Sequence, residues 1–253
     1  GKSSRFPGMR PKWLLTMPDG MLMFEKSLIQ LNLSNFDKII IICLKEHIDN
    51  YISINSLNEI LKKLHNNYEI CILDKPTQSQ VETITQAIRT CDVKGPFFAK
   101  DCDNQFSIEW TGGDEIAFVD IGESDNLINA KNKSYVEIDH LSNVTNIVEK
   151  KVISNFFCCG GFGFSSASSF ADHFELINKD NEVYVSHIVY SMLIAGTNFK
   201  GIKASKYIDW GTASDYYRYV NSFQTIFCDV DGVLFLNGSK FGKDGWNTKP
   251  IIE

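Results

Sequence analysis

Positively charged side chains gather at the start of the chain, beside a short run of small residues. Lys2, Arg5, Arg10 and Lys12 fall within eleven positions. Small residues let backbone N–H groups approach a phosphate closely, and those present here are Gly1, Ser3 and Ser4. The Arg5 guanidinium can bind phosphate oxygens with two parallel hydrogen bonds, while Lys12 offers a mobile point charge. Residues 1–12, called the basic loop below, therefore predict a polyphosphate site; the alternative is a solvated basic turn.

Two acidic side chains follow an apolar run in the middle of the chain. Asp101 and Asp103 come directly after Pro96–Lys100, which is typical of a buried strand. Carboxylates at the end of a strand suit Mg²⁺, which binds a few carboxylates together with substrate phosphate. Two Asp residues in a loop can also form Asx turns or helix caps, and on spacing alone this alternative stays open.

The first half of the chain alternates short apolar runs with helical patterns. The runs predict strands at Lys38–Cys43, Tyr68–Leu73 and Pro96–Lys100, and the patterns predict helices at Asn55–Leu64 and Val81–Thr90. This alternation with short connections predicts an α/β fold with a doubly wound, mostly parallel sheet. Ligands bind beyond the carboxyl ends of the strands in such sheets, which is where Asp101 and Asp103 fall.

The pattern changes in the middle of the chain. Four short strands with turn residues between them predict a smaller antiparallel or mixed insertion: Glu115–Asp120, Tyr135–Ile138, Val144–Glu149 and Phe156–Cys159. Helical patterns then return at Ser168–Asn178, Val183–Ala195 and Ala213–Val220.

Composition excludes several classes of protein. A formal net charge of -6 over 253 residues argues against a nucleic-acid surface. The 7 cysteines form no CxxC motif and no zinc-ligand spacing, which indicates reduced thiols. No apolar run approaches the ~20 residues that a membrane helix needs. We expect a cytoplasmic protein without a membrane span, and the sequence does not indicate its oligomeric state.

The basic loop resembles a known signature. Gly1-Lys-Ser-Ser-Arg5-Phe6, followed by Pro11-Lys12 and two leucines, is similar to the G-x-S/T-x-R-F…P-K loop of sugar-phosphate nucleotidyltransferases, whose catalytic domains have the GT-A-like fold. In that family an apolar strand and Ala-Gly precede the loop, and only the final Gly stands here. The resemblance implies catalytic roles for Arg5 and Lys12 on the triphosphate. It implies nucleotide contacts for Gly1, Lys2, Ser3, Ser4 and Asp101.

The resemblance also implies a metal site. Asp103 corresponds to the family's metal-binding Asp after the central strand. Asp209-Trp-Gly-Thr, followed by Asp215-Tyr-Tyr, resembles the late D-x-G-T-x-x-D-Y segment, in which the first Asp completes the metal site. Asp103 and Asp209 are therefore the expected Mg²⁺ ligands, and Asp215 has the simpler role of capping or supporting the following helix.

Further matches imply where the base and the acceptor bind. The turn before the helix at 81–90 contacts the base in this family, which assigns Gln78 and Gln80 to the nucleotide; Thr77 or Ser79 can equally be a helix cap there. Glu149-Lys150 resembles the acceptor-side E-K pair, and Gly160-Gly161-Phe162 resembles the glycine-aromatic strand. Lys150 is then a catalytic residue that holds the acceptor phosphate, or else a solvated surface lysine. The acceptor-binding residues implied are Glu149, Gly161 and Glu182.

The tail carries a different motif. Thr225–Cys228 predicts a strand that ends in Asp229-Val-Asp231-Gly232, which resembles the opening motif of haloacid-dehalogenase-type phosphatases. In that family the first Asp attacks phosphorus and the second is an acid/base beside Mg²⁺. We expect residues 1–221 to form the nucleotidyltransferase domain and 222–253 to begin a phosphatase-like domain that needs a longer chain for activity.

These observations predict a nucleotidyltransferase that uses Mg²⁺ and a nucleoside triphosphate, with CTP or UTP favoured. The acceptor is a sugar 1-phosphate or another small phosphorylated compound, and surface polysaccharide synthesis is the expected setting. The alternatives are a GT-A-type glycosyltransferase and a non-catalytic nucleotide-binding regulatory module.

Overall fold

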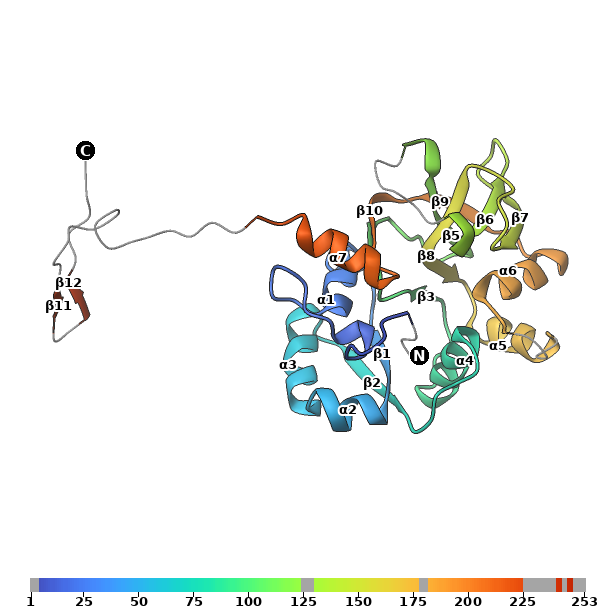
Figure 1. The fold of residues 1–253 in the computed structure, drawn as a ribbon. Coiled ribbons are helices and arrows are strands. Elements are labelled where there is room, and N and C mark those ends of the chain that lie inside the picture. Colours follow the sequence, from blue (N-terminus) through green and yellow to red (C-terminus); the bar gives the residue numbers. More distant parts are fainter. Residues whose placement is uncertain (1–4, 124–129, 178–181, 225–239, 243–244, 248–253) are drawn as a thin grey trace.

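The structure is a computed structural model that describes residues 5–123, 130–177, 182–224, 240–242 and 245–247. Helices pack beside β-strands through most of the chain (Figure 1). The α/β class predicted from the alternating pattern is confirmed.

The first β-α-β unit forms a small parallel sheet. Strands β1 (Ile39–Leu44) and β2 (Tyr68–Leu73) pair along six positions. They are joined by helices α2 (Lys45–Tyr51) and α3 (Ile54–Leu64). Helix α3 begins where the Ser53 side chain accepts a hydrogen bond of 3.0 Å from the backbone N–H of Ser56. Its apolar face buries Leu57 and Leu61 completely, which anchors α3 beside the strands.

A larger sheet has six strands in the order β7-β6-β8-β5-β9, with β3 paired to β8. The bounds are β3 (Phe97–Lys100), β5 (Glu115–Asp120), β6 (Ser134–Ile138), β7 (Val144–Glu149), β8 (Phe156–Phe164) and β9 (Lys200–Lys203). The pairs β1–β2 and β5–β9 are parallel, whereas β8 runs antiparallel to β3, β5 and β6. Within the described residues, parallel pairing is therefore less extensive than predicted, because the long strand β8 runs antiparallel to all three of its neighbours.

Three helices cover the larger sheet. They are α4 (Gln80–Thr90), α5 (Ala167–Leu176) and α6 (Val185–Ile194). Their apolar faces and the strands enclose one core, in which Phe164, Phe170 and Phe199 are fully buried. The rings of Phe164 and Phe170 meet edge to face with centroids 4.8 Å apart. This core packs the three helices against the strands of the larger sheet.

A third pairing forms a short two-stranded ribbon. Strand β4 (Asn104–Ser107) runs antiparallel to β10 (Ser205–Asp209). Helix α7 (Ala213–Asn221) follows β10, and helix α1 (Met23–Leu28) contacts β4. Figure 1 shows α7 beside α1.

Aromatic packing attaches the described part of the basic loop to the segment around α7. Phe6, Trp210 and Tyr216 belong to one buried cluster, with the Phe6 and Tyr216 ring centroids 6.5 Å apart. The Tyr216 hydroxyl also donates to the Thr16 carbonyl at 2.7 Å. The start of the chain and α7 are thereby held together.

The predicted elements agree with the structure to within a few residues, except that β8 continues five residues beyond Cys159. Elements that the sequence patterns did not predict are α1, α2, β4, β9, β10 and the paired strands β11 (Lys240–Gly242) and β12 (Gly245–Asn247). The predicted strand at Thr225–Cys228, with Asp229 and Asp231, lies outside the described residues. In the part of the chain that the structure describes, no helix has the length and apolar character needed to cross a membrane.

Candidate active site

Two carboxylates predicted as metal ligands lie side by side. In the β4–β10 pair, Asn104 stands opposite Asp209. The backbone N–H of Trp210 donates to the carbonyl of Asp103 at 2.8 Å, which extends the pairing by one residue. The Asp103 and Asp209 side chains are only 9% and 17% exposed. The structure therefore brings together two residues that are far apart in the sequence.

Gly211 leaves a small space between these carboxylates. A Cβ atom added there would lie 3.0 Å from Asp209 Oδ1, 3.5 Å from Asp103 Oδ2 and 3.7 Å from Arg5 Nη1. The Gly211 N–H donates to Asp209 Oδ1 at 3.0 Å and fixes that carboxylate. Two carboxylates and a guanidinium thus border one small space, which a side chain at this position would fill.

Lys12 forms an ion pair with Asp103. Pro11 precedes a 3-10 helix at Lys12–Leu14, and the burial of Leu14 anchors this turn. Lys12 Nζ lies 2.6 Å from Asp103 Oδ2. Burial disfavours both charged forms, but the pair outweighs burial: the pKa of Lys12 is raised and that of Asp103 is held well below its usual range. Both groups are therefore ionised at neutral pH.

Arg5 lies at the rim of the same site. Its neighbour Phe6 is 2% exposed and packs in the aromatic cluster with Trp210, which fixes the backbone beside Gly211. The positive charge of Arg5 contributes to the low pKa of Asp103, after that of Lys12. Four other residues predicted for the nucleotide, Gly1, Lys2, Ser3 and Ser4, lie outside the described residues.

The loop between β3 and β4 is held from inside by Lys100. The Lys100 ammonium donates to the carbonyls of Asp101 (2.6 Å) and Asn104 (2.9 Å) and lies 4.4 Å from the Phe106 ring centroid. Burial lowers the pKa of Lys100 to about 8. The Gln80 amide donates to the Asp101 carboxylate, whose pKa is raised by burial and by Asp103. Lys100 therefore shapes the loop that presents both acidic residues.

The predicted acceptor residues form a second wall. Glu149 accepts hydrogen bonds from the hydroxyls of Ser134 and Ser186, the latter at 2.7 Å. Lys150 donates to the Tyr184 hydroxyl, which itself donates to Glu182. Lys150 Nζ also lies 4.1 Å from the Tyr184 ring centroid. Lys150 is thus tied to an aromatic side chain in the site and differs from a freely solvated lysine.

A pocket of about 440 Å³ lies between the two walls. One wall carries Arg5 and the acidic residues, and the other carries the acceptor set. The predicted site residues that line the pocket are Arg5, Gln80, Asp101, Asp103, Glu149, Lys150, Glu182 and Asp209. Lys12 reaches this pocket through its ion pair with Asp103.

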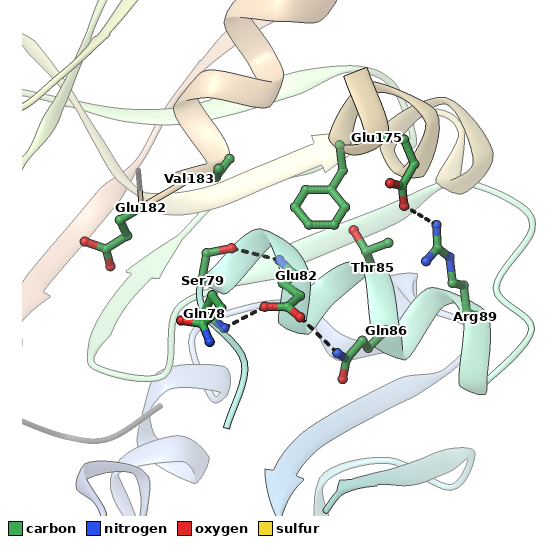
Figure 2. A pocket seen from close by; sticks show the side chains of 10 residues that line it. Gln78, Ser79, Glu82, Thr85, Gln86, Arg89, Glu175, Glu182 and Val183 are labelled. Carbon is green, nitrogen blue, oxygen red and sulfur yellow. Dashed lines mark hydrogen bonds and ion pairs between the residues drawn. The ribbon is translucent and has the colours of Figure 1, made fainter. Parts of the chain in front are cut away.

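Two predicted residues stand apart from this pocket. Gly161 is buried in β8, where a Cβ would lie 2.5 Å from Phe106 Cζ and 2.7 Å from Phe98 Cζ; its neighbour Gly160 lines the pocket instead. Gln78 lines another pocket, of about 600 Å³, between α4 and α5 (Figure 2). Glu182 borders both pockets, so they are adjacent.

The helix caps follow the simpler alternatives weighed from the sequence. The Ser79 side chain accepts from the N–H of Glu82 at 3.1 Å and caps α4. Thr212 caps α7 by accepting from the N–H of Asp215 at 3.2 Å, and its hydroxyl donates to the Asp215 carboxylate at 2.6 Å. Asp215 therefore supports the start of α7, as predicted.

The residues present fit a Mg²⁺ ion. Asp103 and Asp209 place carboxylate oxygens around the space beside Gly211, and such oxygens are the ligands that this ion prefers. No group of three or more His, Cys, Asp and Glu side chains is arranged as a metal site within the described residues. Mg²⁺ often binds through one or two carboxylates and completes its shell with water and substrate phosphate. The site would thus hold the ion together with a nucleotide.

Sequence patterns missed several residues of the pocket. Two of them are Lys133, which pairs with Asp209, and Tyr184, which contacts Lys150. Each stands at the beginning of a strand or helix and is separated from its partner by at least 34 positions. The spacing of residues in the sequence does not indicate such contacts. One signal was available: an Asp expected in a buried site requires a cation nearby, so a lysine or arginine partner for Asp209 could have been sought.

Comparison with solved structures shows the fold. The chain is similar to a nucleoside-diphosphate-sugar pyrophosphorylase from Vibrio cholerae (TM-score 0.73, 16% identity, 87% of this chain and 97% of that one). It is also similar to an inositol-1-phosphate CTP transferase from T. maritima (0.66, 14%, 88% and 91%) and a UDP-glucose pyrophosphorylase solved with UDP-glucose (0.67, 14%, 88% and 94%). No protein-family model and no curated protein matches the sequence. The chain has the fold of these nucleotidyltransferases, which confirms the predicted GT-A-like architecture.

Gly160 offers a test of the site's geometry. Its φ is 87°, and a Cβ there would lie 2.5 Å from Asp101 Oδ2 and 2.6 Å from Asn104 Nδ2. We expect Gly160→Ala to displace the Asp101 loop. Binding of the nucleotide that the resemblance implies should then weaken at least about tenfold, because a misplaced site group typically costs this much or more.

Gly196→Ala is the matched control. Gly196 has a φ of 94°, but nothing lies within 4 Å of its Cβ position. It carries the same backbone cost, about 1–2 kcal/mol, without the collision. Urea unfolding and nucleotide titration of both variants separate the two effects. Equal loss of nucleotide binding in both variants would contradict the role given to Gly160.

Proposed function

We propose that this chain is a nucleotidyltransferase that joins a nucleotide to a small phosphorylated acceptor and releases pyrophosphate. The observation that carries the proposal is the arrangement of the pocket. Arg5 and the Lys12–Asp103 pair lie on one wall with Asp209, and Glu149 and Lys150 lie on the other. Cations beside carboxylates suit a triphosphate with its metal ion, and the second wall leaves room for an acceptor.

The reaction is an in-line substitution at the α-phosphorus. An oxygen of the acceptor phosphate forms a bond to this phosphorus, and the bond from it to the oxygen that bridges the β-phosphorus breaks. Pyrophosphate leaves with that bridging oxygen and the electron pair. Phosphate oxygens are already competent nucleophiles, so catalysis depends on positioning and on charge stabilisation.

Each residue has a role in this scheme. Mg²⁺, when bound, neutralises charge on the triphosphate. Asp103 and Asp209 hold that ion, while Arg5 and Lys12 stabilise charge that moves onto the leaving pyrophosphate. Gln80, which binds Asp101, lies on the nucleotide side. Lys150 positions the acceptor phosphate, and Glu149 and Glu182 supply hydrogen-bond acceptors for the rest of the acceptor.

The substrates follow from the same chemistry. The proposal takes CTP or UTP as the favoured nucleotide and a sugar 1-phosphate or another small phosphate as acceptor. The names of the similar structures support this choice, since they include a CTP transferase and a UDP-glucose pyrophosphorylase. Synthesis of surface polysaccharide precursors in the cytoplasm is the setting that we infer.

Product analysis distinguishes this proposal from the two alternatives. The assay mixes the protein and Mg²⁺ with each nucleoside triphosphate and a panel of phosphorylated acceptors, and it measures pyrophosphate. A glycosyltransferase would instead release a nucleoside diphosphate from a nucleotide sugar, and a regulatory module would bind nucleotide without turnover. Either of those results would replace the proposed activity.

Loss of a proposed metal ligand should abolish turnover. We expect Asp103→Ala and Asp209→Ala each to lower pyrophosphate release ~10²-fold or more, because each removes charge compensation at the reacting phosphates. Asp172→Ala, on the exposed surface of α5, is the control and should retain full activity. A folded Asp103→Ala or Asp209→Ala protein with wild-type turnover would remove that residue from the metal site.

Substitution of either cation of the basic loop, Arg5 or Lys12, should slow turnover. Lys12→Ala should raise the barrier by about 2–4 kcal/mol, the usual effect of removing a preorganised charge stabiliser. Arg5→Lys should also reduce kcat, because an ammonium cannot reproduce two parallel guanidinium hydrogen bonds. Steady-state kinetics measure both effects, with exposed Lys63→Ala as control. Wild-type kinetics for Arg5→Lys would rule out bidentate binding of phosphate.

The domain division is part of the proposal. Residues 1–221 would form the nucleotidyltransferase domain, and Asp229 and Asp231 would belong to a haloacid-dehalogenase-type unit that begins at 222–253. Asp229→Asn should therefore leave pyrophosphate release unchanged, since separate sites without shared partners act independently. Pyrophosphate assays on the wild type and this variant provide the measurement. A fall in nucleotidyl transfer would place the boundary or the site elsewhere.

A further inference from the structure

Lys133 holds Asp209 from the acceptor side of the pocket. It lies directly before β6, with its side chain 15% exposed. Its ammonium pairs with Asp209 Oδ2 and donates to the Tyr207 hydroxyl at 2.8 Å. Lys133 also lines the 440 Å³ pocket. No motif in the sequence indicated this residue. In the structure it neutralises the charge of Asp209.

The surroundings of this ion pair restrain the ammonium. Tyr207 and Phe157 are 6% and 0% exposed, and Lys133 Nζ lies 5.5 Å and 5.8 Å from their ring centroids. A lysine on an aromatic platform has fewer orientations than one on the surface, so the pair is preorganised. The Coulomb attraction is also stronger than at a fully exposed site.

The backbone of Lys133 reaches the opposite wall. Its carbonyl accepts a hydrogen bond of 3.1 Å from the N–H of Lys150, which has the unusual φ of 55°. Lys133 therefore lies between the metal-binding carboxylates and the residue proposed to hold the acceptor phosphate. A cation at this point is placed where the two phosphates must meet during transfer.

We propose that Lys133 is a phosphate ligand for the reacting nucleotide and that Asp209 is its partner in the free protein. This inference rests on the proposed function. A divalent ion that binds Asp209 competes with the Lys133 ammonium for the same carboxylate. Released from that pair, the ammonium can turn toward an oxygen of the phosphate beside it in the pocket. Lys133 thus restrains metal binding in the free protein and assists transfer in the complex.

Opposite effects on two measurements test this role. In Lys133→Met, Asp209 loses its competing cation. Mn²⁺ titrated without nucleotide and followed by electron paramagnetic resonance should therefore bind about 2–5-fold tighter, the scale of a partly exposed ion pair. Pyrophosphate release should fall ~10²-fold, the effect of losing one charge stabiliser. Lys131→Met, on the exposed surface nearby, should change neither measurement.

Lys133→Arg keeps the positive charge and provides a second test in case the methionine variant does not fold. Its Mn²⁺ affinity should equal that of the wild type, while turnover falls because the guanidinium differs in length and geometry. Weaker or unchanged Mn²⁺ binding in folded Lys133→Met would overturn the competition, and unchanged turnover in either variant would overturn the phosphate contact. If wild type binds Mn²⁺ but releases no pyrophosphate with any substrate, the proposed function fails; the Mn²⁺ comparison still decides the competition for Asp209.

Discussion

The antiparallel contact between β4 and β10 is the interaction on which the site depends. It places Asn104 opposite Asp209 and continues to the hydrogen bond between Trp210 and Asp103. Without it the carboxylates would belong to unrelated loops. The pairing also fixes Gly211, and through Trp210 it supports the aromatic cluster that carries Phe6 and hence Arg5. One short two-stranded ribbon therefore sets the distances among the acidic and basic residues of the first wall.

Electrostatics constrains the rest of the pocket. Burying an unpaired carboxylate costs several kcal/mol, so each buried acid needs a cation or hydrogen-bond donors close by. Lys12 serves Asp103 and Lys133 serves Asp209, while Gln80 donates to Asp101. Lys100 has carbonyl oxygens as partners and a lowered pKa. Asp103 and Asp209 are therefore each compensated by a lysine, and Asp101 by an amide donor.

Sequence patterns predicted the parts of this arrangement that are local. The apolar run at 68–73 predicted the bounds of β2. The capping of α4 by Ser79 and the support of α7 by Asp215 were also predictable, because a helix cap involves residues only a few positions apart. Asp209 was assigned as a metal ligand through resemblance to a family segment. The structure places it beside Asp103, and its role stays a prediction.

Contacts between distant segments were beyond such patterns. Lys133 looks like any other lysine in its local sequence, and its pairing with Asp209 depends on the start of β6 lying close to the end of β10. Gly161 was predicted from the Gly160-Gly161-Phe162 motif, which does not distinguish between its two glycines. Only the packing of Phe98 and Phe106 shows which of the two is enclosed and which borders the pocket.

The packing of Phe6 on Tyr216 also bears on how the protein matures during translation. The ribosome releases the basic loop about two hundred residues before α7, yet the Phe6 ring packs against a side chain of that helix. At a synthesis rate of about 5–20 residues per second, this interval lasts roughly ten to forty seconds. For that time Phe6 has partners only from its own part of the cluster, such as Leu15 and Met17, and none from α7. The packing around Phe6 is thus completed late, when two segments far apart in the sequence meet.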